Sequence, residues 1–233
     1  MNIRAVLFDL GGTLIDYPSL DTFENVCEKR WRDIIGPHPE ILMRMHEIYK
    51  QERETSFQSL RDAILSIFLD KALKESRLFL DSKDRETILR KFYYFSMQKH
   101  ARPYKGAAKL LKAIKNKDLK IGLISNTPFA GEYHEEDLKR FRIFSYFDIR
   151  IWSSEFGLRK PHPAIFYKAL QLLKVVPREA IYIGDKFSRD VEGPNRVGMR
   201  AILINQKGEK KEFFGWQVNE LNEILKIIKK DPL

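Results

Sequence analysis

The second half of the chain alternates between short apolar runs and longer segments whose apolar residues recur every three or four positions. The apolar runs cover residues 121–124, 149–152, 180–183 and 201–204, and a similar run at residues 5–8 lies near the N-terminus. Runs this short predict buried strands, and the periodic segments between them, such as the one with Leu110, Leu111 and Ile114, predict amphipathic helices. This alternation predicts an α/β fold, in which helices cover both faces of a doubly wound parallel sheet.

The segment between the first strand and the second has a different pattern, because residues 19–100 show helical spacing without an alternating β-branched run. Its apolar stripes are Leu20, Phe23, Val26, Cys27, Arg30 and Trp31; Ile41, Met45, Ile48 and Tyr49; Leu60, Ile64, Ile67 and Phe68; and Ile88, Phe92 and Phe95. The pattern predicts an all-helical insertion with its own small core. We expect an α/β core domain at residues 1–16 and 102–233 and a helical domain at residues 17–101.

The amino-acid composition limits the classes of protein to which the chain could belong. The chain has 233 residues, of which 43% are hydrophobic and 32% charged, as in folded proteins. No apolar run is long enough for a membrane span and the N-terminus lacks the layout of a signal peptide, so we expect a cytoplasmic protein without a membrane partner. Basic residues give a net charge of +10 but are mixed with acidic ones, which does not favour nucleic-acid binding. The single cysteine, Cys27, excludes an internal disulfide and gives no zinc signature.

Polar residues that could take part in catalysis or metal binding follow the predicted strands. They are Asp9 in the stretch FDLGGTL, Ser125 and Asn126 after the strand at 121–124, Lys160 in GLRKPHP, Asp185 after the strand at 180–183, and Asp190 five residues further on. Each alone is explained by a turn, a helix cap or a solvated charge. Because the carboxyl ends of parallel strands meet at one edge of a sheet, however, these residues are expected to converge there.

Taken together, these residues match the four motifs of the haloacid dehalogenase superfamily in order and strand context, and the chain resembles that family along its whole length. The resemblance implies a Rossmann-like core, and it implies that the helical insertion is a C1-type cap. It also implies a hydrolase in which Asp9 is the nucleophile and forms an aspartyl ester, while Ser125 and Lys160 bind the transferred group and neutralise charge. Backbone amides near Leu10 and Asn126, together with Gly11, would contribute to substrate binding.

The same resemblance implies a magnesium site. Asp9, the backbone carbonyl of Gly11 and Asp185 would hold Mg²⁺, and Asp190 would orient a ligand or its waters. Hard oxygen donors suit Mg²⁺, which can also share a phosphate of the substrate. Without a cation and Lys160, a phosphate dianion would face several carboxylates and be repelled. The expected partner is therefore a small anionic, phosphorylated metabolite.

Gly11 departs from the family pattern. Phosphatases of the family usually have an aspartate there, which protonates the leaving oxygen and activates water. Three alternatives follow: a phosphatase in which water, a cap residue or Asp16 does this work; a metal-free dehalogenase of 2-halo acids, whose halide leaves without a proton; or a non-catalytic anion-binding protein. The motif Gly184-Asp185 favours the phosphatase, because the family's dehalogenases have a Ser-Ser-Asn-like motif instead. Tyr17, Arg30, Trp31 and Arg32 lie early in the insertion and are candidates for substrate contact.

Overall fold

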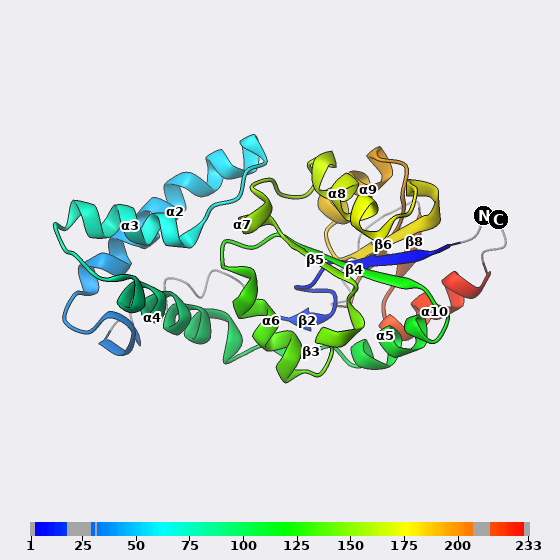
Figure 1. Ribbon diagram of the computed structural model, residues 1–233, viewed down its shortest axis with the longest axis horizontal. Coiled ribbons are helices and arrows are strands. Elements are labelled where there is room, and N and C mark those ends of the chain that lie inside the picture. The colour runs from blue at the N-terminus through cyan, green and yellow to red at the C-terminus, as the bar shows by residue number, and fades with distance from the viewer. Residues whose placement is uncertain (1–2, 18–28, 31, 207–214, 231–233) are drawn as a thin grey trace.

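A single parallel sheet forms the centre of the computed structural model, which describes residues 3–17, 29–30, 32–206 and 215–230 (Figure 1). The sheet has the strand order β5-β4-β1-β6-β7-β8. Its strands are β1 (Ala5–Phe8), β4 (Lys120–Ser125), β5 (Ile149–Trp152), β6 (Ala180–Gly184), β7 (Arg200–Ile204) and β8 (Trp216–Val218). All the pairings are parallel, and β1 lies between β4 and β6. The predicted strands are present, and β8 is an edge strand that the sequence pattern did not predict.

Helices cover both faces of this sheet. They are α5 (Ala107–Lys115), α6 (Gly131–Arg140), α7 (Ser153–Phe156), α8 (Pro163–Leu173), α9 (Gly193–Arg196) and α10 (Leu221–Lys230), with 3₁₀ turns η2 (Phe144–Tyr146) and η3 (Pro177–Glu179) and the π-helical turn η4 (Phe187–Glu192). Side chains alternate along β1: Val6 and Phe8 join the apolar cluster that contains residues of α5 and α10, whereas Ala5 and Leu7 join the cluster with α8. The predicted doubly wound α/β fold is therefore confirmed.

The described part of the helical insertion lies beside the sheet and includes α2 (Pro39–Ser59), α3 (Leu65–Glu75), α4 (Ser82–Tyr93) and the π-helical turn η1 (Tyr94–Gln98) (Figure 1). Its apolar cluster includes the predicted stripes of α2 and α4. Within the described residues, no helix combines the length and apolar character needed to cross a bilayer.

The third predicted stripe is wrong in part. Leu60 ends α2 in the left-handed region, with φ 54°, and α3 starts a new helical phase at Leu65. Ile67 is therefore 47% exposed. The buried face of α3 is instead Leu65, Phe68, Leu69, Ala72 and Leu73. Of the first stripe, Leu20, Phe23, Val26, Cys27 and Trp31 lie outside the described residues.

The two ends of the insertion meet in a short antiparallel pair. Strand β2 (Ile15–Asp16) pairs with β3 (Arg102–Pro103), so the chain enters and leaves the insertion at neighbouring points. On this basis we propose residues 17–101 as a separate domain and residues 1–16 and 102–233 as the core domain.

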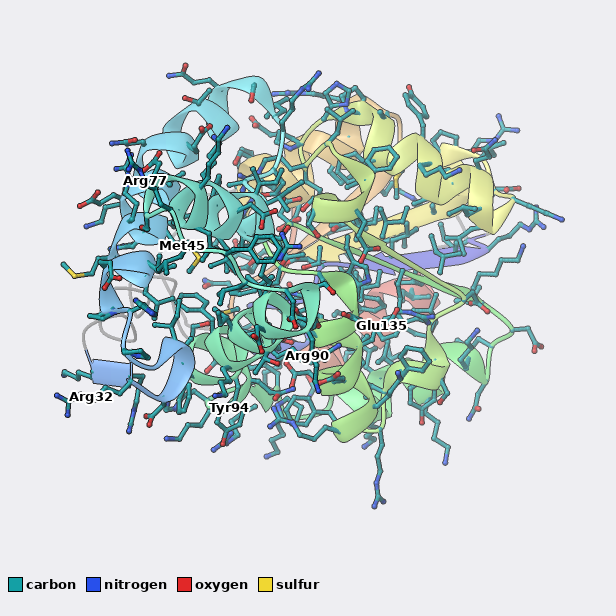
Figure 2. The ribbon with its side chains drawn as sticks, turned by 60° about the vertical axis from the view of Figure 1, so that its left-hand side comes forward. Arg32, Met45, Arg77, Arg90, Tyr94 and Glu135 are labelled. Atoms are coloured by element: carbon teal, nitrogen blue, oxygen red, sulfur yellow. The ribbon has the colours of Figure 1, made fainter. Side chains whose placement is uncertain are left out.

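The insertion is docked on α6. Arg90 of α4 pairs with Glu132 and Glu136 of α6, at 3.0 and 2.6 Å, and its guanidinium lies 4.8 Å from the ring centroid of Tyr133. Figure 2 shows Arg90 where the insertion meets the core. In addition, the ring of Phe92 stacks on that of Phe129, just before α6. These contacts hold the helices of the insertion next to the edge of the sheet where the strands β1 and β4 end.

Candidate active site

The ends of β1, β4 and β6 bring polar residues to one edge of the sheet. Asp9 follows β1, and its N–H donates to the carbonyl of Ile183 in β6, at 2.9 Å. Ser125 is the last residue of β4 and is 5% exposed, and Asp185 directly follows β6. The structure therefore brings Asp9, Ser125 and Asp185 to the three adjacent strand ends, as the parallel topology predicts.

Lys160 reaches this edge from the loop before α8 and is 2% exposed. Its ammonium group donates three hydrogen bonds of 2.7 Å, to Asp9 Oδ1, Asp190 Oδ1 and the hydroxyl of Tyr182. The hydroxyl of Tyr182 in turn donates to the carbonyl of Ile124, at 3.1 Å. The buried ammonium thus has a partner for each of its three protons, which offsets the cost of removing the charge from water.

Asn126 fixes the backbone of Lys160. Its Oδ1 accepts from the N–H of Lys160 at 2.8 Å, and its Nδ2 donates to the carbonyl of the same residue at 2.9 Å. This reciprocal pair ties the loop after β4 to the loop that holds the lysine. The side chain of Asn126 is therefore engaged with Lys160, so its contribution to substrate binding would come from its backbone.

The surroundings of Asp9 shift the pKa of its carboxyl group. The pKa of its carboxyl group is raised from 3.8 to about 6, mainly by burial; Lys160 lowers this pKa, whereas the neighbouring Asp190 and Asp185 raise it. The carboxyl group is therefore mostly ionised at neutral pH and available as a nucleophile.

An acidic group that could hold a cation is formed by Asp9, Asp185 and Asp190, whose oxygens lie within 4.8 Å of one another. Oδ1 of Asp185 is buried and has no hydrogen-bond partner in the described part of the chain. Its Oδ2 pairs with Lys186 at 2.9 Å, through a side chain that is 51% exposed. Asp190 is engaged on both oxygens, by Lys160 at 2.7 Å and by the N–H of Lys186 at 2.9 Å. An orphaned carboxylate oxygen within an all-oxygen group fits Mg²⁺.

A glycine allows Asp185 to approach the first loop. Gly12 has φ +81°, and a Cβ at this position would lie 2.5 Å from Asp185 Oδ2. Any other residue would be strained by this backbone conformation and would displace the carboxylate. Both the turn and the position of the candidate metal ligand therefore require glycine.

The loop at residues 10–14 is held by its own backbone. The carbonyl of Leu10 accepts from the N–H groups of Leu14 and Ile15 at 2.9 and 3.0 Å, and Gly11 forms a bridge with Ile15. From the end of β7, the side-chain amide of Gln206 donates to the carbonyls of Thr13 and Gly12, at 2.8 and 3.2 Å. The side chain of Leu10 is fully buried, so only its backbone can face a ligand.

Sequence reasoning missed Tyr182 and Gln206. Tyr182 lies in the middle of an apolar run that predicts a buried strand, although a hydroxyl group inside such a strand requires a buried polar partner. Gln206 follows a strand without any turn motif, so no local signal identified it.

The remaining candidates, Asp16 and those from the insertion, are dispersed. Asp16 accepts a hydrogen bond from the hydroxyl of Tyr104 at 3.1 Å. Arg30 pairs with Asp33 at 3.6 Å, with about half of each side chain exposed. Arg32 lies on the outer side of the insertion (Figure 2), and Trp31 is outside the described residues. Tyr17 borders the position of Gly11, because a Cβ on residue 11 would lie 3.4 Å from its Cδ2.

Comparison with known proteins identifies the family of this chain. A family model described as haloacid dehalogenase-like hydrolase matches residues 6–204. The glyceraldehyde 3-phosphate phosphatase of Methanopyrus kandleri is 28% identical over 207 residues, a match that covers 88% of this chain and 84% of the relative. Further relatives with the same name match over only 46% to 60% of their own length.

Solved structures share the fold. The HAD phosphatase from Thermococcus onnurineus superposes with a TM-score of 0.66 at 24% identity, over 99% of this chain and 100% of the other. The 2-haloacid dehalogenase from Pseudomonas syringae gives a TM-score of 0.72 at 20% identity, over 98% and 99%. At such identities the likeness establishes the fold alone. The family model, however, spans most of the chain and includes Asp9, Ser125, Lys160 and Asp185. The chain therefore belongs to the haloacid dehalogenase-like hydrolase family.

Proposed function

We propose that this protein is a cytoplasmic, Mg²⁺-dependent phosphatase that hydrolyses a small phosphomonoester through an aspartyl-phosphate intermediate. Family membership and relatives named as phosphatases support a phosphatase-type hydrolase. The metal, the mechanism and the substrate class rest on the geometry of the site.

In the first half of the reaction, a carboxylate oxygen of Asp9 attacks the phosphorus atom. The bond from phosphorus to the leaving oxygen breaks, and that oxygen takes a proton from water, from a residue of the insertion or from Asp16. Lys160 holds Asp9 through a 2.7 Å hydrogen bond and neutralises charge that develops on the phosphoryl group. The hydroxyl of Ser125 and the backbone amides near Leu10, Gly11 and Asn126 would bind the phosphoryl oxygens. In the second half, water attacks phosphorus, phosphate leaves and Asp9 is restored.

Asp9, the carbonyl of Gly11 and Asp185 would hold Mg²⁺. When bound, the cation would neutralise the carboxylates and phosphoryl oxygens that face each other in this site. Asp190 would act through its neighbours, because its two oxygens already orient Lys160 and the loop at Lys186.

The observation that supports a metal-dependent phosphatase over a dehalogenase is the excess of carboxylates. Asp9 and Asp190 share the buried cation Lys160, whereas Asp185 pairs through Oδ2 with the exposed Lys186 and its Oδ1 has no partner in the described residues. A metal-free site with this balance would repel the carboxylate of a 2-halo acid. A divalent cation converts the same group into a binding site for a phosphate dianion.

One assay separates the alternatives. Phosphate release from p-nitrophenyl phosphate and acetyl phosphate, and chloride release from 2-chloropropionate, are measured with Mg²⁺ and with chelator. We expect phosphate release that chelator abolishes. Phosphate release that chelator does not reduce would refute the metal site. Chloride release without metal would establish a dehalogenase. Anion binding without turnover of any substrate would indicate a binding protein.

A further inference from the structure

The loop between α2 and α3 (residues 60–64) connects the insertion to the two core loops that carry the site. The backbone N–H of Arg159, in the loop before α8, donates to the carbonyl of Leu60 at 2.9 Å. Directly after residues 60–64, the N–H of Leu65 donates to the carbonyl of Pro128 at 3.0 Å, in the loop after β4. One segment of the insertion therefore contacts both core loops.

Asp62 lies at the centre of this contact, and its side chain is 4% exposed. Its Oδ2 accepts a hydrogen bond from Ser153 Oγ, whereas Oδ1 accepts from the N–H of Ala63 at 3.0 Å and lies 3.6 Å from Nη1 of the buried Arg159. Ser153 begins α7, which lies at the side of the core that faces the insertion (Figure 1). A buried carboxylate of the insertion is thus bound by two side chains of the core.

A relay of hydrogen bonds joins Asp62 to the loop after β4. The N–H of Thr127 donates to Ser153 Oγ at 2.8 Å, so the hydroxyl of Ser153 directs its own proton to Asp62. Ser153 and Thr127 are both buried, so water does not compete for these hydrogen bonds. Thr127 directly follows Ser125 and Asn126, which would bind the phosphoryl group. The backbone that presents these two residues is therefore held through Asp62.

The second arm of the contact runs through Arg159 to the neighbouring Lys160. Burial raises the pKa of Asp62, whereas Arg159 and the hydrogen bond from Ser153 lower it. The guanidinium and the hydrogen bonds offset the cost of burying the carboxylate. Because Arg159 directly precedes Lys160, this contact holds the loop before α8 on one side, while Asn126 holds the same loop from the other.

From these contacts we propose that Asp62 is a positioning residue, through which the insertion fixes the loop after β4 and the loop before α8 for phosphoryl binding. The inference rests on the proposed function. Asp62 does not touch the reacting atoms, because it acts through Ser153 on the backbone of Thr127 and through Arg159 on the loop of Lys160. Its loss displaces the phosphoryl-binding groups without removing them, and a displacement of about 1 Å can lower the rate about 10²-fold.

The test separates displacement of these groups from simple loss of stability. Inorganic phosphate, the product, competes with p-nitrophenyl phosphate for the same groups, and its inhibition constant does not depend on the folded fraction of the enzyme. For Asp62→Ala in Mg²⁺, we expect this constant to rise at least about fivefold and kcat/KM to fall about 10-fold to 10²-fold.

Ser153→Ala breaks the relay but keeps the ion pair of Asp62 with Arg159, so it tests the relay independently of the stability of Asp62→Ala. It should raise the inhibition constant of phosphate in the same direction. Because the two residues act in one relay, the double variant should lose no more than Asp62→Ala alone. Additive losses would refute the relay.

Arg90→Met is the matched control. Arg90 also joins the insertion to the core by ion pairs, but through α6, which carries none of the site residues. Its inhibition constant for phosphate should stay within about twofold of the wild type. A rise equal to that of Asp62→Ala would assign the effect to docking of the insertion in general and refute the inference.

An unchanged inhibition constant in both Asp62→Ala and Ser153→Ala would also refute the inference, and it would leave the proposed function intact. A wild-type protein that hydrolyses neither p-nitrophenyl phosphate nor acetyl phosphate would instead refute the proposed function.

Discussion

Replacing Asp9 with asparagine should stabilise the fold at pH 8 while it abolishes turnover. The carboxyl group is buried beside Asp185 and Asp190, and its pKa lies at about 6 instead of 3.8. Between these values the folded protein binds a proton that the unfolded chain lacks. The contribution of Asp9 to stability is therefore fully present below pH 3.8 and is lost as the pH rises through 6.

The magnitude follows from the displacement of the pKa. A rise from 3.8 to about 6 corresponds to about 3 kcal/mol of destabilisation above pH 7, at about 1.4 kcal/mol for each pKa unit. Asparagine has nearly the same shape and carries no charge, and Lys160 keeps Asp190 and Tyr182 as partners. We therefore expect Asp9→Asn to raise the free energy of unfolding by up to about 3 kcal/mol at pH 8, and by much less at pH 4.

Urea unfolding of the wild type and of Asp9→Asn, in chelator at pH 4, 6 and 8, measures this difference. Asp70→Asn is a control, because Asp70 is an exposed partner of Arg85 and its loss should change stability by less than about 0.5 kcal/mol. Added Mg²⁺ should stabilise the wild type more than Asp9→Asn, since binding to the folded state alone adds stability. A variant that is less stable than the wild type at pH 8, or a difference independent of pH, would refute the electrostatic account of the site.

Three further substitutions test how the site is built. Asn126→Ala removes both hydrogen bonds to the backbone of Lys160 and should lower the free energy of unfolding by about 1–3 kcal/mol in urea titration. It should also lower kcat for phosphate release. An unchanged kcat would show that the loop holds Lys160 without these two hydrogen bonds. Gly12→Ala places a Cβ against Asp185 at a residue with a left-handed φ and should weaken Mg²⁺ binding, as measured by calorimetry. Gly157→Ala, with φ +83° and no atom within 4 Å of the new Cβ, should lose similar stability but keep its Mg²⁺ affinity. Equal Mg²⁺ affinities in the two variants would contradict the role of the contact with Asp185. Lys160→Met leaves Asp9 and Asp190 without their shared cation and should lower the free energy of unfolding by about 3–5 kcal/mol at pH 8, and by less at pH 4, in the same urea experiment. A variant that is as stable and active as the wild type would exclude Lys160 from the site.

The strands and the convergence of the site were predictable because their signals are local. Apolar runs bounded by turn residues identified β1, β4, β5, β6 and β7, and parallel topology then required Asp9, Ser125 and Asp185 to end at one edge. The strand β8 is short and begins with the partly exposed Trp216, so its pattern is too weak to identify.

Contacts between distant segments could not be predicted. The sequence does not reveal that α3 begins a new phase at Leu65, because this depends on the left-handed backbone of Leu60. Likewise, Tyr17 and Asp137 lie 120 residues apart and meet only because the insertion packs on α6.

The central claim is that Asp9 carries the phosphoryl group during turnover. Quenching the enzyme in acid while it turns over acetyl phosphate, followed by mass spectrometry of the peptide that contains Asp9, tests this claim directly. The account predicts one phosphoryl group on Asp9 in the presence of Mg²⁺, none in chelator and none in Asp9→Asn. Steady release of phosphate with no phosphoryl group on Asp9, or with the group on another residue, would contradict it.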